Sequence, residues 1–361
     1  SAVPAAVELP AGPRTVIVAG DGPPAVGAAA IDLARAAGLP LIAEPSSNAR
    51  VAPALRCGRL VLGTSLAAEV ERVVVFGHPT LSRPVMRLLA RADVEVIAVA
   101  DGDWPDPGHR VRLVVPAVAI PPSDPAWLRR WADADAAASE RVDAVLAEAA
   151  STPMDPRETA STPSGPLDVR TALTGWALAD AVWRAASGLP LVIGSSQPIR
   201  DADLAPIAER PPVVYANRGL AGIDGTVSTA AGIALATGRP TILLCGDLTF
   251  GHDGNGLAIG PGEPRPDLRI VVADDSGGSI FATLEYGHER FAPAFERVFT
   301  TATGTDLAAL AAAHGVPALR VSTAEELDAA LARPIDGLDV VVVALDRSRR
   351  RELDQAMSPA R

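Results

Sequence analysis

The sequence predicts an α/β protein with two Rossmann-like domains, each a doubly wound parallel sheet. Short apolar segments, such as TVIVAG at 15–20, alternate with Ala-rich helical stretches along the chain. Fully apolar strands separated by helices are typical of a parallel sheet covered on both faces. A Ser-, Thr- and Pro-rich segment at 151–168 interrupts the alternation, and this composition is typical of a linker.

The elements before the linker predict one such domain. Helices are expected at 24–37 and 82–91, and strands at 15–20, 40–45, 70–77, 94–100 and 111–115. A polar helix with two tryptophans is expected at about 124–150. We therefore expect a first domain at 1–123, followed by a helix and linker at 124–168.

The elements after the linker repeat the same rhythm. Helices are expected at about 169–187 and 306–314, and strands at 189–195, 213–218, 241–247, 269–275 and 339–345. These elements predict a second α/β domain at 169–361.

The composition excludes several classes of protein. A formal charge of −11 and a pI of about 5.0 argue against a nucleic-acid surface, which needs a basic stripe. No apolar run reaches the ~20 residues that span a bilayer. The two cysteines do not form a disulfide framework, so a cytoplasmic location is expected. All basic residues are arginines, whose planar guanidinium suits carboxylates.

Two strands of the second domain end in acidic residues. TILLCGD ends at Asp247, and RIVVADD ends at Asp274 and Asp275, which lies 28 residues after Asp247. Ligands of open parallel sheets bind at the carboxyl ends of strands, and oxygen ligands favour Mg²⁺ held together with substrate phosphates. The alternative is that the acids cap helices or end strands at the surface. The pairing of the two acids, with glycines after each, favours the metal site.

Three segments around these acids resemble a known family. They are GSSQPIRDAD at 194–203, ANRGLAGIDGTVSTAAGIA at 216–234 and GDLTFGHDGNGL at 246–257. Together they resemble the 2-succinyl-5-enolpyruvyl-6-hydroxy-3-cyclohexene-1-carboxylate synthases, thiamine-diphosphate enzymes of menaquinone biosynthesis. The resemblance is specific over about 167–300, and weaker over 14–120, which looks like the family's middle domain.

The resemblance implies a set of cofactor-binding residues for thiamine diphosphate and Mg²⁺ or Mn²⁺. Family members usually have Asn where Asp275 and Ser276 stand, and Asp274 is a rival for the metal-ligand role. The implied metal ligands are Asp247, Asp275 and the Gly277 carbonyl, and the implied cofactor contacts are Leu248, Thr249, Ile223 and Ser196. Among these, Ile223 resembles the apolar residue that holds the cofactor in its bent form.

The resemblance also implies a pocket for two dianionic substrates, 2-oxoglutarate and isochorismate. Arg200 and Arg218 would hold their carboxylates, since Arg pairs with carboxylates bidentately. Ile280 and Phe281 match the apolar wall of that pocket. The alternatives are a local ion pair of Arg200 with Asp201 or Asp203 and a surface position for Arg218.

The first domain carries weaker signals. Gly20 and Gly22 follow a strand, and Glu44 ends the next one, which partly imitates a dinucleotide fingerprint. The third glycine is misplaced, so we expect a Rossmann-like fold without nucleotide. Arg83 matches a position where the family places a basic residue near the substrate. A further hypothesis is that Arg83, Arg87 and Arg110 form a pocket for an anionic regulator.

The expected reaction is decarboxylation of 2-oxoglutarate and conjugate addition of the carbanion to isochorismate. Thiamine chemistry also needs an activating Glu, which the family carries in an N-terminal pyrimidine-binding domain and donates across a homodimer or homotetramer interface. We find no such domain in the sequence, so no catalytic residue is assigned and the chain alone should be inactive. Alternatives are another thiamine-diphosphate carboligase or decarboxylase, and a non-catalytic anion-binding fragment.

Overall fold

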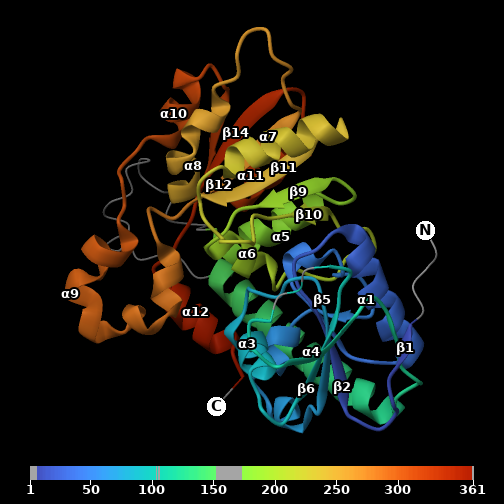
Figure 1. Ribbon diagram of the computed structural model, residues 1–361. Coiled ribbons are helices and arrows are strands. Elements are labelled where there is room, and N and C mark those ends of the chain that lie inside the picture. Colours follow the sequence, from blue (N-terminus) through green and yellow to red (C-terminus); the bar gives the residue numbers. More distant parts are fainter. Residues whose placement is uncertain (1–5, 103, 105, 152–172, 360–361) are drawn as a thin grey trace. The chain divides into compact units, whose positions relative to one another are not determined.

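Two six-stranded sheets organise the chain (Figure 1). The computed structural model describes residues 6–102, 104, 106–151 and 173–359. The chain forms two compact units, of which the first contains 1–142, 206–214 and 357–361 and the second contains 143–205 and 215–356. The central strands of both sheets pair in parallel, and the predicted α/β fold with two doubly wound sheets is confirmed. Apart from Ser151, the expected linker lies outside the described residues.

The first sheet has the strand order β4-β3-β2-β5-β6-β7. Its strands are β2 (Thr15–Ala19), β3 (Leu41–Ala43), β4 (Ala54–Leu55), β5 (Arg72–Phe76), β6 (Glu95–Val99) and β7 (Val111–Val115), and the helices are α1 (Pro24–Ala37), α2 (Gly58–Val61) and α3 (Arg83–Leu89). A short pair, β1 (Val7–Glu8) with β8 (Val118–Ala119), accompanies them. Alternate residues of β2 enter two separate cores, Ile17 in one and Val16 and Val18 in the other. Both faces of the sheet are therefore buried, which explains the uninterrupted apolar strands.

The long helix α4 (Pro125–Ser151) belongs in part to this first unit. Trp127 and Trp131 are buried in its core, with ring centroids 5.7 Å apart in an edge-on arrangement. The Trp127 indole also donates a 2.9 Å hydrogen bond to the Thr15 carbonyl. The unit consequently extends to Val142 rather than ending at residue 123. The sequence did not show this because the polar face of α4 dominates its composition.

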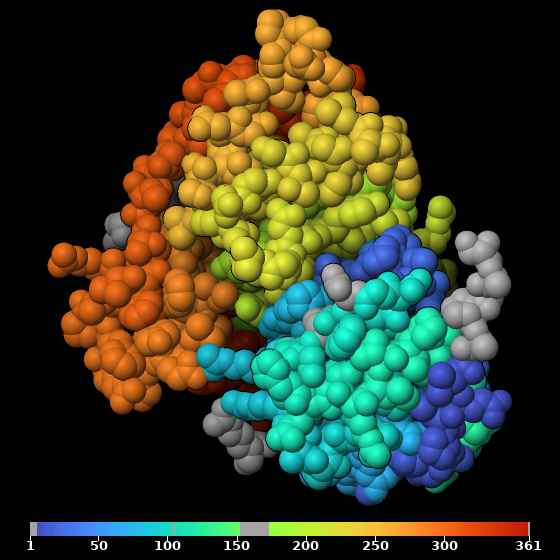
Figure 2. Space-filling view, viewed as in Figure 1, coloured from blue at the N-terminus to red at the C-terminus, as the bar shows by residue number. Residues whose placement is uncertain are grey.

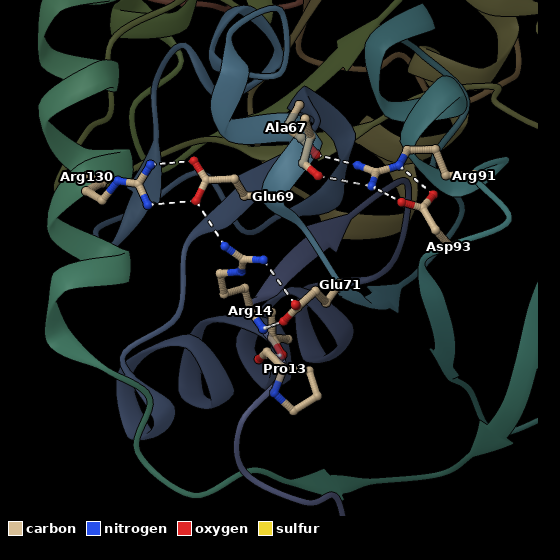
Figure 3. A network of polar contacts seen from close by, with 10 residues as sticks. Pro13, Arg14, Ala67, Glu69, Glu71, Arg91, Asp93 and Arg130 are labelled. Atoms are coloured by element: carbon tan, nitrogen blue, oxygen red, sulfur yellow. Dashed lines mark hydrogen bonds and ion pairs between the residues drawn. The ribbon is translucent and has the colours of Figure 1, made fainter.

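A group of ion pairs lies on the surface of the first unit (Figure 3). Glu69 accepts hydrogen bonds from both Arg130 and Arg14, and these guanidinium groups lower the pKa of Glu69. Arg14 also binds Glu71, and Arg91 binds Asp93. Exposed pairs of this kind are screened by solvent and add little stability. The stability of the unit therefore depends on its two apolar cores.

The second sheet has the strand order β10-β9-β11-β12-β14-β13. Its strands are β9 (Pro190–Ile193), β10 (Val213–Tyr215), β11 (Thr241–Gly246), β12 (Leu268–Asp274), β13 (Ala318–Val321) and β14 (Leu338–Ala344). Its helices are α5 (Gly175–Ala185), α6 (Gln197–Ala202), α7 (Thr226–Thr237), α8 (Asp247–His252), α9 (Ala292–Phe295), α10 (Leu307–Ala313), α11 (Ala324–Ala332) and α12 (Arg350–Met357). The sequence did not predict β13, a largely exposed edge strand, or the helices α6, α8, α9, α11 and α12. No helix in the described ranges combines the length and apolarity needed to cross a membrane.

The register of the central strands decides where the acidic residues lie. β11 and β12 pair in parallel, with Gly246 opposite Ala273. Asp247 follows the first strand directly, and Asp274 ends the second. The carboxylates therefore meet at one edge of the sheet, where ligands of open α/β sheets bind.

Candidate active site

A cavity of about 370 Å³ lies at this edge of the second sheet. Its lining comes from segments far apart in the chain, including the loop before α6, the loop before α7, the start of α8 and the segment after β12. Eleven residues predicted from the sequence line it together: Ser196, Arg200, Arg218, Ile223, Asp247, Leu248, Thr249, Asp275, Gly277, Ile280 and Phe281. Arg83 is not among the lining residues; it begins α3 in the first unit.

Two carboxyl groups in the cavity lining, Asp247 and Asp275, have raised pKa values. Burial, followed by the charges of Asp275 and Asp274, raises the pKa of Asp247, against the N–H groups of Leu248 and Gly277. Burial also raises the pKa of Asp275, although the Ser279 hydroxyl and the Arg350 and Arg347 charges oppose this shift. Two carboxylates that both resist ionisation form a site that a cation would stabilise. Asp274 is buried and is not among the lining residues.

The donors present fit a small, oxygen-preferring ion. Among the described residues, no three Asp, Glu, His or Cys side chains converge on a metal position. Two carboxylates and a backbone carbonyl leave further positions for phosphate or water oxygens, as Mg²⁺ prefers. Gly277 has a φ of 132°, and a Cβ atom there would lie 2.3 Å from the Thr300 carbonyl oxygen. Only glycine therefore allows the backbone to pass beside the carboxylates in this way.

At the start of α8, the Leu248 N–H donates a 2.7 Å hydrogen bond to the Asp247 carboxylate. This bond stabilises the charged form of Asp247 and fixes its orientation. Thr249 is 2% exposed and lines the cavity beside it.

Ile223 lies in the loop between β10 and α7, and Asp253 holds the first turn of α7 that follows this loop. The Asp253 carboxylate accepts hydrogen bonds of 2.6 and 3.2 Å from the N–H groups of Val227 and Ser228 in the first turn of α7. A carboxylate at a helix N-terminus satisfies free amides and the helix dipole. Sequence reasoning missed Asp253, although it lies within GDLTFGHDGNGL, one of the segments that carried the resemblance.

Both predicted substrate arginines belong to the cavity wall. Arg218 is 5% exposed, so the expected surface alternative is wrong for this residue. Arg200 lies on α6, whose Asp201 was one alternative partner for it. The Asp201 carboxylate receives the two Nη groups of Arg350 and, at 2.8 Å, Nε2 of Gln197.

Ser196 precedes α6 in an unusual backbone conformation. Its φ of 81° and ψ of −132° fall in a region that residues with a side chain rarely adopt. Such conformations persist only where the surrounding structure enforces them, and they concentrate at ligand sites. The strain at this position agrees with its place in the cavity lining.

The segment after Gly278 forms a cap, residues 279–300, that supplies Ile280 and Phe281 to the cavity. It consists of single turns, Ser279–Thr283, Glu285–Gly287, Glu289–Phe291, α9 and the π turn Glu296–Thr300. Phe299 is the centre of its small aromatic cluster, with ring centroids 4.5 Å from Tyr286 and 5.5 Å from Phe281. The cap forms a large exposed surface of the second unit, orange in Figure 2.

The signals of the first unit support structural roles. Glu44 is 4% exposed and accepts hydrogen bonds from the N–H groups of Thr80 and Leu81, at 3.2 and 2.9 Å. A Cβ atom on Gly20 would lie 2.0 Å from the Pro79 nitrogen, so this glycine serves chain packing. Arg83 and Arg87 are exposed on α3, and Arg110 is exposed just before β7. An anion pocket at these three arginines stays a prediction.

Comparison with known proteins defines first a class of domain and then a family. Residues 197–345 match the family described as "Thiamine pyrophosphate enzyme, C-terminal TPP binding domain". The second unit therefore resembles the cofactor-binding domain of thiamine pyrophosphate enzymes.

The relatives of the whole chain are more specific. The chain is 47% identical to the 2-succinyl-5-enolpyruvyl-6-hydroxy-3-cyclohexene-1-carboxylate synthase of a Nocardioides species, over 99% of this chain and 66% of the relative. The synthases of Kineococcus radiotolerans and Paenarthrobacter aurescens are 49% and 43% identical, over 96% and 99% of this chain and 61% and 62% of their own lengths. The chain is therefore a homologue of these synthases, and it spans less than two thirds of their length.

The pair of carboxylates makes the stability of the metal-free protein depend on pH. Because the folded state raises both pKa values, it retains protons that the unfolded chain has released, and stability falls as pH rises above the unfolded pKa of about 4. We expect the melting temperature in a chelator to decrease from pH 5 to pH 8. Asp275→Asn, the residue usual in the family, should reduce this decrease by removing one charge. Glu289→Gln, at an exposed cap residue, is the control, and an unchanged slope in Asp275→Asn would contradict the prediction.

Proposed function

We propose that this chain supplies the diphosphate, metal and substrate-arginine half of the active site of a thiamine-diphosphate-dependent enzyme. The enzyme would decarboxylate 2-oxoglutarate and add the resulting carbanion to isochorismate. The observation that carries the proposal is the cavity, which gathers Asp247, Asp275, Gly277, Arg200 and Arg218 in one site. The synthase relatives support the choice of reaction.

In this proposal, separate residues of the cavity bind the metal ion and the cofactor. Asp247, Asp275 and the Gly277 carbonyl would hold Mg²⁺ or Mn²⁺, which binds the diphosphate. Thiamine diphosphate, when bound, supplies the thiazolium carbon that stabilises the carbanion left by loss of CO₂ from a 2-oxo acid. Ile223 would support the cofactor ring, while Ser196 and Thr249 line the cavity beside it.

The substrate side would recognise charge and exclude water. Arg200 and Arg218 would bind carboxylates of the two dianionic substrates and orient them. Ile280 and Phe281 of the cap would form the apolar wall that keeps water from the reactive carbon. A second set of residues, including the activating Glu, would come from a pyrimidine-binding domain, and we expect a homodimer or homotetramer to complete the site. The first unit would correspond to the middle domain of the relatives.

The arginine assignment can be tested by steady-state kinetics with the proposed pyrimidine-binding domain present. Arg200→Met or Arg218→Met should raise the KM for 2-oxoglutarate by about 10- to 100-fold, because a charge-assisted hydrogen bond contributes roughly 1.5–3 kcal/mol. Arg297→Met, an exposed cap residue with the same charge change, should behave like the wild type.

A comparison of pyruvate with 2-oxoglutarate as substrates distinguishes the proposal from another thiamine-diphosphate carboligase. Pyruvate, which carries one carboxylate less, should be a poor substrate for the wild type. If pyruvate reacted as well as 2-oxoglutarate and both arginine variants kept the wild-type KM, an acetolactate-synthase-like carboligase would replace the proposal. Binding of anions by the first unit without any cofactor binding would instead indicate a regulatory fragment.

A further inference from the structure

The segment after β14 contacts the cavity walls through three arginines. It begins at Leu345, continues into α12, and forms part of the cavity lining through Asp346, Arg347 and Arg350. Each arginine binds a different group of atoms. Arg347 binds Glu296 and Thr300, Arg350 binds Asp201, and Arg351 binds the carbonyl oxygens of Ala282 and Leu284.

The Arg350–Asp201 pair is buried and closely packed. The side chains are 5% and 3% exposed, and both Nη groups of Arg350 bind the carboxylate, one of them at 3.0 Å. The guanidinium carbon lies 3.6 Å from the ring centroid of Trp176, a cation–π contact. A Cβ atom on Gly175 would lie 2.4 Å from Asp201 Oδ2 and 2.9 Å from Arg350 Nη1. The pair is therefore packed closely against the beginning of α5.

The pair connects Arg350 to α6, a helix too short to be stable without contacts to the rest of the unit. α6 has 6 residues, and isolated helices of this length are unstable in water. It follows the strained Ser196 and presents Arg200 to the cavity. Asp201 joins α6 to Arg350 over a separation of 149 residues in the sequence. A buried ion pair gives little net stability relative to apolar side chains, so the geometry it enforces is its better-supported role.

The other two arginines hold the cap. Arg351 donates 2.8 Å hydrogen bonds to the carbonyl oxygens of Ala282 and Leu284, beside Ile280 and Phe281 in the chain. Arg347 binds both oxygens of Glu296, at 3.1 and 2.8 Å, near the far end of the cap. The cap has only single turns of helix, so these bonds supply order that its own backbone does not.

We propose that Arg347, Arg350 and Arg351 form a C-terminal clasp that sets the spacing of the α6 wall and the cap wall of the cavity. Arg350 is a positioning residue: it acts through Asp201 on Arg200, which in the proposed function binds a substrate carboxylate. The clasp thereby makes dianion recognition depend on a segment that follows the last strand of the sheet.

The first test measures hydrogen exchange without cofactor or substrate, so it does not depend on the proposed function. Arg350→Met should increase amide exchange in α6 by at least about tenfold, since local opening follows lost contacts. Because a lone buried Asp201 could prevent folding, the double variant Asp201→Leu/Arg350→Met removes both charges and should show the same increase in a folded protein. Arg349→Met is the matched control, because Arg349 binds Glu352 within α12. Wild-type exchange in the double variant would overturn the clasp.

The second test uses steady-state kinetics with the proposed pyrimidine-binding domain present. The double variant should raise the KM for 2-oxoglutarate about tenfold and change the affinity for Mg²⁺–thiamine diphosphate less than about threefold. The single variant Arg350→Lys, which keeps a charged contact with Asp201, should raise the KM less than the double variant does. Arg349→Met should have the KM of the wild type. An equal loss of cofactor affinity, or an unchanged KM, would overturn the positioning role. If exchange in α6 rose but even Arg200→Met left the KM unchanged, the proposed function would fail while the clasp remained.

Discussion

Asp247→Ala is expected to abolish the Mg²⁺-dependent binding of thiamine diphosphate, with a loss in affinity of about 100-fold or more. Asp247 is one of the two proposed carboxylate ligands in the cavity lining, and the ion would lose a charged ligand. The variant also removes the acceptor of the Leu248 N–H, so the first turn of α8 loses its orientation. Calorimetric titration of cofactor with and without Mg²⁺ measures the combined loss of affinity.

The neighbouring aspartates provide the controls for this experiment. Asp275→Asn should keep metal-dependent binding, since an amide oxygen can replace a carboxylate oxygen as a ligand, whereas Asp275→Leu should lose it. Asp274→Asn should bind normally, because Asp274 is buried and does not line the cavity. Normal binding by Asp247→Ala would remove the basis of the metal site. Loss of binding in Asp274→Asn alone would transfer the ligand role to Asp274.

Gly277→Ala is expected to destabilise the protein by roughly 2–4 kcal/mol and to prevent cofactor binding. The new Cβ atom would lie 2.3 Å from the Thr300 carbonyl oxygen, and a φ of 132° is unfavourable for any residue with a side chain. Relief of the clash would move the cap or the backbone beside Asp275. Urea denaturation without cofactor measures the change in the free energy of unfolding.

Gly251→Ala is the matched control for this substitution. Gly251 lies in α8, is exposed, and has no atom within 4 Å of the position that a Cβ would occupy. Alanine in an exposed helix should stabilise the protein by about 0.5–1 kcal/mol. The same chemical change thus has opposite expected signs at two glycines of one unit. Equal free energies of unfolding for Gly277→Ala and the wild type would contradict the conformational argument.

Much of the site could be predicted because its residues follow strands directly. Asp247 ends an apolar run, and parallel strands place their carboxyl ends together, so the sheet rule alone brings Asp247 and Asp275 to one edge. Arg200, Arg218 and Ile223 came from the resemblance of their segments, and the cavity gathers all three. Asp253 and Arg350 were missed because each acts through a bond to a distant segment.

The sequence by itself determined the class of fold, the strand ends that carry the acids, and the family of which the chain is a homologue. These follow from local periodicity and short motifs, in which neighbours in the chain carry the signal. Only the tertiary structure decided that Asp275 rather than Asp274 lines the cavity, that Trp131 draws α4 into the first core, and that Arg350 binds Asp201. The reason is that side-chain direction and contacts between distant segments depend on packing, which no local pattern encodes.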